Sequence, residues 1–327
     1  MPPQSNLTGA LLSLAAFAVY ASNDVIVKFL GASYSPFQTI FFSVLFGFPL
    51  VLLMLIGDAA DGNLIPRHPW SALARAVLTV ICVLCGFYAF SVLPLTEAYP
   101  IFFATPILIT LIAIPMLGEK VGLHRGMAVA VGLIGVIVVV RPGNAHFGLG
   151  HLAAIASASF GAINSVLVRK IGNSERSVVI MLYPMMANLI VAGAALPFIY
   201  VPMPVAHLGL SLAMSVMGFC GGLLAIAAYR RAPAVIVAPM QYSQIIWATI
   251  FGALIFDETH DTVTLIGTGI IIASGIYIVL REGTPSVSKN RPVLEARSRI
   301  DMGLMPRLST WLRLFDRRAR KAAQDRS

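Results

Sequence analysis

The stretch SVLPLTEAYPIFFATPILITLIAIPMLGEKVG, residues 91–122, decides the fold class of this chain. Its central part, residues 98–117, is a largely apolar run without a charge, bounded by Glu97 on one side and Glu119 on the other. A run of about 20 such residues is long enough to cross the hydrocarbon core of a bilayer as a helix. Because lipid offers no hydrogen-bond partners, the backbone must satisfy itself within the segment, which favours a helix over irregular chain.

Nine further segments have the same character, and the gaps between them are short and contain Gly, Pro, Asn, Asp or charged residues. Of the 327 residues, 58% are apolar and 11% are charged, with a mean hydropathy of +0.85. Soluble domains carry about 25% charged residues. These values exclude a soluble enzyme, a disordered protein and a secreted disulfide scaffold. The predicted fold is all-α, with ten transmembrane helices at 9–30, 37–56, 71–93, 98–117, 124–140, 149–168, 177–200, 208–229, 234–256 and 263–280.

The distribution of positive charge predicts how the chain lies in the membrane. The net charge is +9, and residues 283–327 contribute most of it, with 11 Lys/Arg against 4 Asp/Glu. Basic loop residues favour the cytoplasmic side. If the N-terminus is inside, only Lys28 and Arg141 occupy outside loops and span ends, and the inside loops hold Arg67, Lys120, Arg169, Lys170, Arg176, Arg230 and Arg231. We therefore expect a multi-pass protein of the bacterial inner membrane with both termini in the cytoplasm.

The two halves of the chain resemble each other at an offset of 139 to 141 residues. Gly9, Ala21, Asn23, Val27, Lys28 and Gly31 align with Gly150, Ala162, Asn164, Val168, Arg169 and Gly172. Pro100, Phe103, Thr110, Glu119 and Arg141 align with Pro239, Tyr242, Thr249, Glu258 and Arg281. Each copy has five spans, and an odd number makes the second copy enter the membrane upside down. Inverted repeats are typical of secondary transporters, with the substrate site near the midplane between the copies.

The quoted stretch, followed by GLIGVIVVVRPG at 132–143, resembles the EamA-type repeat of the drug/metabolite transporter superfamily. Gly118-Glu119 and the Arg-Pro-Gly at 141–143 carry the resemblance. The second copy fits less closely, with Asp257 where Gly is usual and Arg281-Glu282-Gly283 at its end. The resemblance implies a first repeat at 1–142, a second at 149–282 and a basic cytoplasmic tail at 283–327. It also implies transport of a small organic metabolite such as an amino acid, vitamin, nucleotide-like solute or drug.

Charged and polar residues inside the spans are the first candidates for a function, because burying them in lipid is costly. Asp24 and Lys28 are four residues apart and share one helix face. One interpretation is a mutually neutralised pair with Lys28 reaching to the interface; the other is that Asp24 faces a central cavity and binds a proton or a cationic substrate group. Asn23 and Asn164 either hydrogen-bond each other across the repeats or contact substrate. Arg75, five residues into its span, is interpreted as reaching the lipid headgroups.

Prolines mark the places where two spans are expected to break. Pro100 and Pro106 lie in span 4, and Pro239 lies at the matching position of span 9. Paired interruptions in corresponding spans are a sequence pointer to a transporter site. Glu97 either stabilises the N-terminal end of span 4 or couples transport to protons, as Asp24 does in the second interpretation above. The candidate substrate ligands are Asn23, Asp24, Tyr99, Phe103, Asn164, Gln241, Tyr242, Gln244 and Trp247.

The remaining features argue for an accessory tail and against other functions. The spacing of Cys82, Cys85 and the histidines fits no metal motif, so we expect neither a metal nor a cofactor and no catalytic residues. Leu304, Leu308 and Trp311 recur at helical spacing beside arginines, which favours a helix on the anionic leaflet over a disordered basic tail or a nucleic-acid arm. The oligomeric state stays open, with a homodimer as one option. The rival functions are a membrane-embedded lipid enzyme and a non-transporting membrane subunit.

Overall fold

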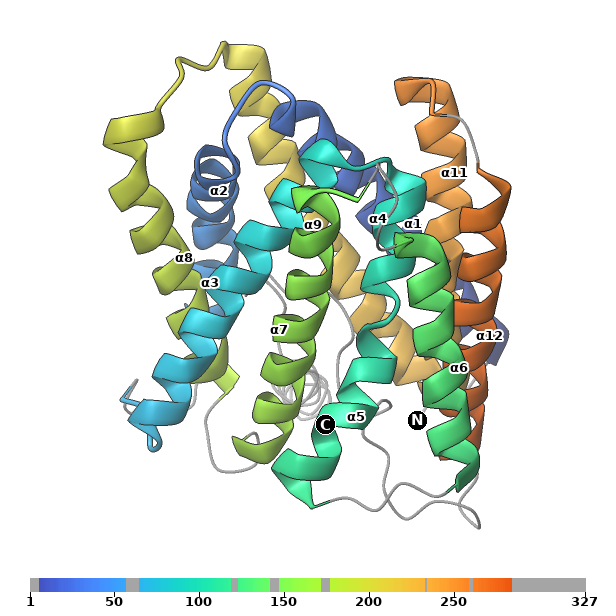
Figure 1. Cartoon of the computed structure of the whole chain (residues 1–327). Coiled ribbons are helices and arrows are strands. Elements are labelled where there is room, and N and C mark those ends of the chain that lie inside the picture. The colour runs from blue at the N-terminus through green and yellow to red at the C-terminus, as the bar shows by residue number, and fades with distance from the viewer. Residues whose placement is uncertain are drawn as a thin grey trace, which may run out of the picture.

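The computed structural model describes residues 6–56, 65–118, 123–141, 147–171, 177–232, 234–258 and 261–283. These residues fold into one helical bundle (Figure 1). The first repeat contains α1 (Asn6–Gly31), α2 (Pro36–Ile56), α3 (Pro69–Val92), α4 (Leu95–Phe102), α5 (Thr105–Leu117) and α6 (Leu123–Val140). The second contains α7 (Leu149–Ile171), α8 (Ser177–Ile199), α9 (Val205–Arg231), α10 (Ala234–Val237), the 3₁₀ turn η1 (Ala238–Tyr242), α11 (Ser243–Phe256) and α12 (Thr262–Gly283).

These elements make ten membrane segments, as the sequence predicts. Seven segments of the described chain are long and apolar enough to cross a bilayer, and shorter apolar helices cover Pro36–Leu52 and Gly126–Val140. The helices α4 and α5 share one segment, Leu95–Leu117, which is interrupted at Phe103 and Ala104. The corresponding segment of the second repeat is also interrupted, because η1 separates α10 from α11. Both interruptions fall in the spans for which the prolines predict them.

The two repeats are related by an inverted pseudo-twofold axis. Helix α1 packs on α9, and its counterpart α7 packs on α3, the counterpart of α9. The same close approach occurs in both places: a Cβ added to Gly9 would lie 2.3 Å from the Cβ of Ala232, and one added to Gly150 would lie 2.9 Å from Leu93. Gly9 and Gly150 are repeat counterparts of each other, and Leu93 and Ala232 are a second pair of counterparts. The internal repeat read from the sequence is therefore also a repeat of contacts.

The last helices of the two repeats, α6 and α12, cross at very short range. A Cβ on Gly135 would lie 3.0 Å from the carbonyl oxygen of Gly267, and one on Gly267 would lie 2.9 Å from that of Gly135. Small residues let membrane helices approach this closely, which gives the packing contacts that hold helices together in lipid. The opposite face of α6 is apolar and exposed, as expected for contact with lipid, and consists of Met127, Val131, Ile134 and Ile137.

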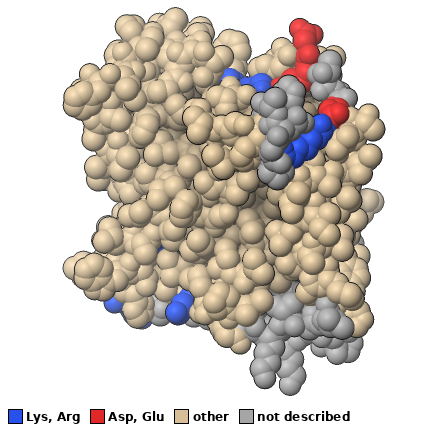
Figure 2. All heavy atoms as spheres, viewed as in Figure 1, with Lys and Arg blue, Asp and Glu red and all other residues tan. Residues whose placement is uncertain are grey.

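Charged side chains concentrate at the two ends of the bundle. On the face in Figure 2 they lie toward the top and the bottom, and the band between them is almost entirely uncharged. We call the end at which α1, α3 and α11 finish the distal end, and the opposite one the proximal end. The predicted tail helix at 304–315 falls outside the described residues, as do Glu119 and the side chain of Arg169.

Candidate functional site

The two interrupted segments meet each other at the centre of the bundle. Phe103 lies in the break between α4 and α5, and Tyr242 is the last residue of η1. Their rings contact edge to face with centroids 5.1 Å apart, and both residues are buried. Because Phe103 and Tyr242 are repeat counterparts, a contact between them lies on or close to the pseudo-twofold axis. This is the position at which inverted-repeat transporters hold their substrates.

A chain of aromatic rings extends from this contact into the first repeat. Phe103 lies 5.8 Å from Tyr99 between ring centroids, and Tyr99 lies 5.5 Å from Phe90 of α3. The four rings present π-faces and two phenolic hydroxyls, one of which, that of Tyr99, is tied to a carboxylate. Aromatic faces of this kind bind flat organic groups and attract cations.

The carboxylate is that of Asp24 in α1. The hydroxyl of Tyr99 donates to its Oδ2 at 2.7 Å, and Nδ2 of Asn23 approaches its Oδ1 at 3.3 Å. Asp24 is only 7% exposed, and Asn23 only 1%. The Tyr99 hydrogen bond holds this carboxyl group beside the rings. Three predicted ligands, Asn23, Asp24 and Tyr99, therefore lie together.

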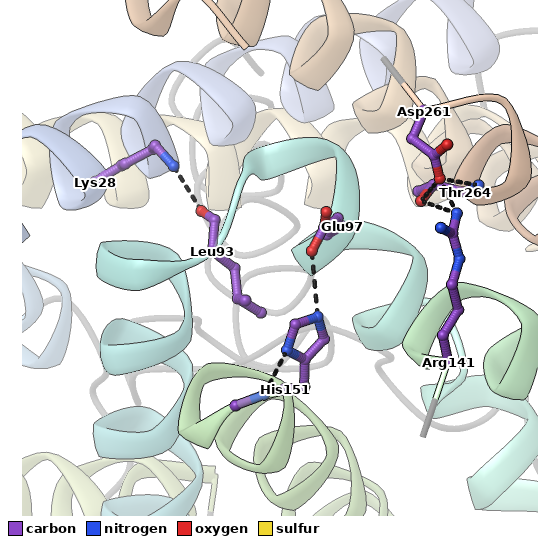
Figure 3. Close-up of polar contacts among 8 residues, drawn as sticks. Lys28, Leu93, Glu97, Arg141, His151, Asp261 and Thr264 are labelled. Atoms are coloured by element: carbon purple, nitrogen blue, oxygen red, sulfur yellow. Dashed lines mark hydrogen bonds and ion pairs between the residues drawn. The ribbon is translucent and has the colours of Figure 1, made fainter. Parts of the chain in front are cut away.

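The interpretation of Lys28 as the partner of Asp24 is wrong. The Lys28 ammonium lies 2.8 Å from Oε1 of Glu258, which follows α11, and donates to the carbonyl oxygen of Leu93 at 2.5 Å (Figure 3 shows the Leu93 contact). It also lies 5.1 Å from the ring centroid of Phe256. The helix-face argument considers only partners within α1, whereas the fold brings an acid from the second repeat to the same place.

Glu97 lies in the first turn of α4, which begins at Leu95 and so two residues before it. Its Oε2 is 3.2 Å from Nε2 of His151, at the start of α7 (Figure 3). The backbone N–H of Gly148 donates to Nδ1 of His151 at 3.4 Å, so both ring nitrogens of His151 have a contact. Since α4 and α7 belong to different repeats, this pair is a second contact between the repeats at the distal end.

Asn23 and Asn164 do not bond to each other, contrary to one of the two interpretations above. Asn164 accepts from Nε of Arg75 at 3.2 Å and donates to Oγ1 of Thr79 at 3.1 Å, both on α3. Inversion of the second repeat places the two asparagines in opposite halves of the bundle, which separates them. Arg75 is 5% exposed, so it is buried within the protein and does not reach the headgroups.

The remaining predicted residues surround the break in the second repeat. Gln241 and Gln244 are buried on either side of Tyr242, and Trp247 is half-buried and stacks on Phe251 with centroids 5.9 Å apart. The three prolines occupy different places. Pro106 is the second residue of α5, directly after the first break, Pro239 lies within η1, and Pro100 lies inside α4.

Sequence reasoning missed the role of Lys28 with Glu258 and that of Arg75 with Asn164. A signal existed for both. The repeat alignment pairs Lys28 with Arg169 and Glu258 with Glu119, so each copy supplies one cation and one acid at equivalent places. An arginine several residues inside a span is itself a sign of an internal partner, because isolated charge in lipid is costly.

Comparisons with known proteins agree with this architecture. Among similar proteins, an S-adenosylmethionine uptake transporter of Rickettsia bellii is 26% identical over 83% of this chain and 92% of its own length. A pseudopaline exporter of Pseudomonas aeruginosa is 25% identical over 83% and 95%. A crystal structure with 16% identity superposes with a TM-score of 0.54, covering 84% of this chain and 96% of that one, which shows a shared fold. The sequence profile of the EamA-like transporter family matches residues 7–141 and 148–281. The chain therefore belongs to the EamA-like transporter family, a family of membrane transporters and not of enzymes.

Proposed function

We propose that this chain is a secondary transporter that binds its solute on the pseudo-twofold axis, between Asp24, Tyr99, Phe103 and Tyr242. The observation that carries the proposal is a buried carboxylate, fixed by Tyr99, next to the meeting point of the two interrupted segments. Rocking of one repeat against the other would expose this place alternately to the two sides. The loop charges support an orientation in the bacterial inner membrane with the distal end outside and both chain termini in the cytoplasm.

The chemistry of these residues favours an organic solute that carries a positive charge. Asp24 offers an anionic group, and the faces of Tyr99, Phe103 and Tyr242 attract cations through the ring quadrupole. A buried carboxylate also favours a cationic partner over water, because burial weakens screening. S-adenosylmethionine, the solute named for the Rickettsia bellii relative, has this character, since it carries a sulfonium and an ammonium group beside a flat base. We propose solutes of this class as substrates.

Asp24 and Glu97 are the proposed coupling groups if transport uses protons. Asp24 would carry either the solute cation or a proton, so that binding of one excludes the other. Glu97 lies at the distal end beside His151, where a proton from outside would arrive first. The two groups therefore have separate roles in this proposal, one at the site and one near its entrance.

Uptake into proteoliposomes tests both the proposed substrate class and the proposed role of Asp24 in binding the solute. We expect the purified protein to accumulate labelled S-adenosylmethionine or a sulfonium analogue. Asp24→Asn should lower the initial rate at least tenfold, because it removes the charge while keeping the shape of the side chain. Asp257→Asn is the matched control, since it makes the same chemical change at an exposed acid on the distal loop. A pH gradient should alter the parent rate if protons are coupled.

Two outcomes would count against the proposal. If Asp24→Asn transports the cationic solute as fast as the parent, the carboxylate does not bind it. If thermal unfolding of the parent shifts upward with anionic solutes and not with cationic ones of equal size, the substrate class is wrong, because a ligand that binds the folded state raises its stability. If the solute flux changes neither with the pH gradient nor with Asp24→Asn, the proposed proton coupling is wrong.

A further inference from the structure

Lys28 and Glu258 form an ion pair that joins the two repeats directly above the candidate site. Lys28 is four residues beyond Asp24 on α1, which is about one helical turn, or roughly 6 Å. Leu95, whose N–H donates to Oε2 of Glu258 at 2.9 Å, is likewise one turn before Tyr99 on α4. The pair therefore sits one turn distal to the carboxylate and to the ring that fixes it, along both helices.

The backbone between α3 and α4 supplies one hydrogen bond to each member of this pair. Pro94 separates the two helices, so the carbonyl of Leu93 follows the end of α3 and the N–H of Leu95 begins α4. Lys28 donates to the carbonyl oxygen of Leu93, and Glu258 accepts a hydrogen bond from the N–H of Leu95. A cation near a helix C-terminus and an acid at a helix N-terminus are each the favourable choice for the helix dipole. The backbone thus favours a cation beside Leu93 and an acid beside Leu95.

The end of α11 presents Glu258 in this position. Asp257 adopts a left-handed conformation with φ 51°, and the N–H of Glu258 closes the helix by donating to the carbonyl of Gly252 at 2.9 Å. The chain then turns back, and the Glu258 carboxylate lies over Gly252, where an added Cβ would come within 2.7 Å of Oε2. Helix α11 also begins one residue after Tyr242, so a shift of this segment would move the ring and the acid together.

We propose that Lys28 and Glu258 are the distal gate of the transporter, a pair that is formed while the site is closed to the distal side and separates when it opens. This inference rests on the proposed function, because a gate presupposes alternating access. The two side chains are 14% and 9% exposed, so the pair is largely shielded from water in the closed arrangement. Once separated, each charge would be hydrated, and an exposed pair of this kind contributes little. The structure holds the closed arrangement of the pair, and the open arrangement is the state that the proposal adds.

Reaction of a cysteine in the site with an impermeant reagent measures this gate without any substrate. The native residues Cys82, Cys85 and Cys220 are replaced by alanine, and Phe103→Cys serves as the reporter on the axis. Intact cells are treated from outside with a methanethiosulfonate that carries a trimethylammonium group. We expect Glu258→Gln to raise the labelling rate at least tenfold, and Asp257→Asn, its neighbour, to leave the rate unchanged.

Variants of Lys28 separate gating from loss of the fold. Lys28→Met should label as fast as Glu258→Gln, whereas Lys28→Arg keeps the charge and should restore a rate near that of the parent. A thermal unfolding curve for each variant shows whether it is folded. Equal labelling of folded Glu258→Gln and the parent, both in cells and in inside-out vesicles, would overturn the gate. Faster labelling of Glu258→Gln in inside-out vesicles alone would support the gate and contradict the proposed orientation instead. Because every variant is treated with the same reagent at the same reporter cysteine, an error in the proposed substrate class changes none of these comparisons.

Discussion

At the scale of single residues, two equivalent positions use the same backbone conformation with different side chains. Gly118 ends α5 at φ 67°, and its counterpart Asp257 ends α11 at φ 51°. Glycine adopts this left-handed region at no steric cost, and aspartate is among the few other residues that tolerate it. The departure from the family pattern at Asp257 is therefore a change of residue type without a change of fold.

Replacing these residues should change stability in opposite directions. We expect Asp257→Gly to stabilise the protein by about 0.5–1 kcal/mol and Gly118→Ala to destabilise it by about 1 kcal/mol, since only glycine is unstrained there. A Cβ on Gly118 meets no atom within 4 Å, so its effect is purely conformational. Thermal unfolding in detergent measures both. If Asp257→Gly proves as destabilising as Asp257→Ala, contacts of the Asp257 side chain matter more than its backbone.

At the scale of the elements, the crossing of α6 and α12 leaves little room for added volume. Gly267 of α12 faces both the carbonyl of Gly135 and the side chain of Val139, which an added Cβ would approach to 2.9 and 2.7 Å. Gly269, two residues further along the same helix, is exposed and has no atom within 4 Å of such a Cβ. The two glycines thus lie on the same helix and differ only in the atoms that surround them.

Gly267→Ala should destabilise the protein by about 1–3 kcal/mol, because the backbone of α6 must move away. Gly269→Ala is the control and should leave the unfolding temperature unchanged or slightly raised, since alanine is the better helix former. Thermal unfolding of the two variants under one set of conditions makes the comparison. A similar decrease in both would mean that helix propensity, and not the crossing, sets the effect.

The elements also show what the sequence can and cannot predict. The ten segments follow from the demand that backbone in lipid bond to itself, so apolar length alone is sufficient. The contact between Phe103 and Tyr242 could be predicted from the sequence, because counterparts in an inverted repeat can touch only at the axis. The partner of Lys28 was missed, because spacing along α1 reports one helix face and says nothing about Glu258; only the repeat alignment carried a signal for that pair. Arg75 was misassigned for the same reason, since its partner Asn164 lies on another helix.

At the scale of the whole molecule, the inverted repeat predicts a proximal counterpart for the gate. Lys28, Glu258, Leu93 and Leu95 correspond to Arg169, Glu119, Ala232 and Ala234, and Pro94 corresponds to Pro233. Glu119 and the side chain of Arg169 lie outside the described residues, so this expectation comes from the sequence repeat. Glu119→Gln should raise labelling of the Phe103→Cys reporter in inside-out vesicles, and not in intact cells. Equal rates for Glu119→Gln and the parent in both preparations would restrict gating to the distal side.

The tail at 284–327 should be an accessory to transport. Both repeat matches end before it, and the described bundle finishes with α12. Deleting it should leave membrane insertion and the unfolding temperature unchanged, because both family repeats lie outside it. The same deletion should weaken association of the detergent-free protein with anionic vesicles if the basic helix lies on the anionic leaflet. Extraction with alkaline carbonate checks insertion, and loss of insertion on truncation would show that the tail is needed for assembly.

The contact between Lys28 and Glu258 also has a consequence for biogenesis. Lys28 belongs to the first helix that is made, and Glu258 emerges roughly 230 residues later, which takes on the order of 10–50 s at typical rates of synthesis. Throughout that interval the lysine is in the membrane without its acid. A nascent or truncated product that lacks the second repeat therefore displays an uncompensated cation near the membrane surface. Insertion of the last two spans is therefore the step that gives this cation its acid.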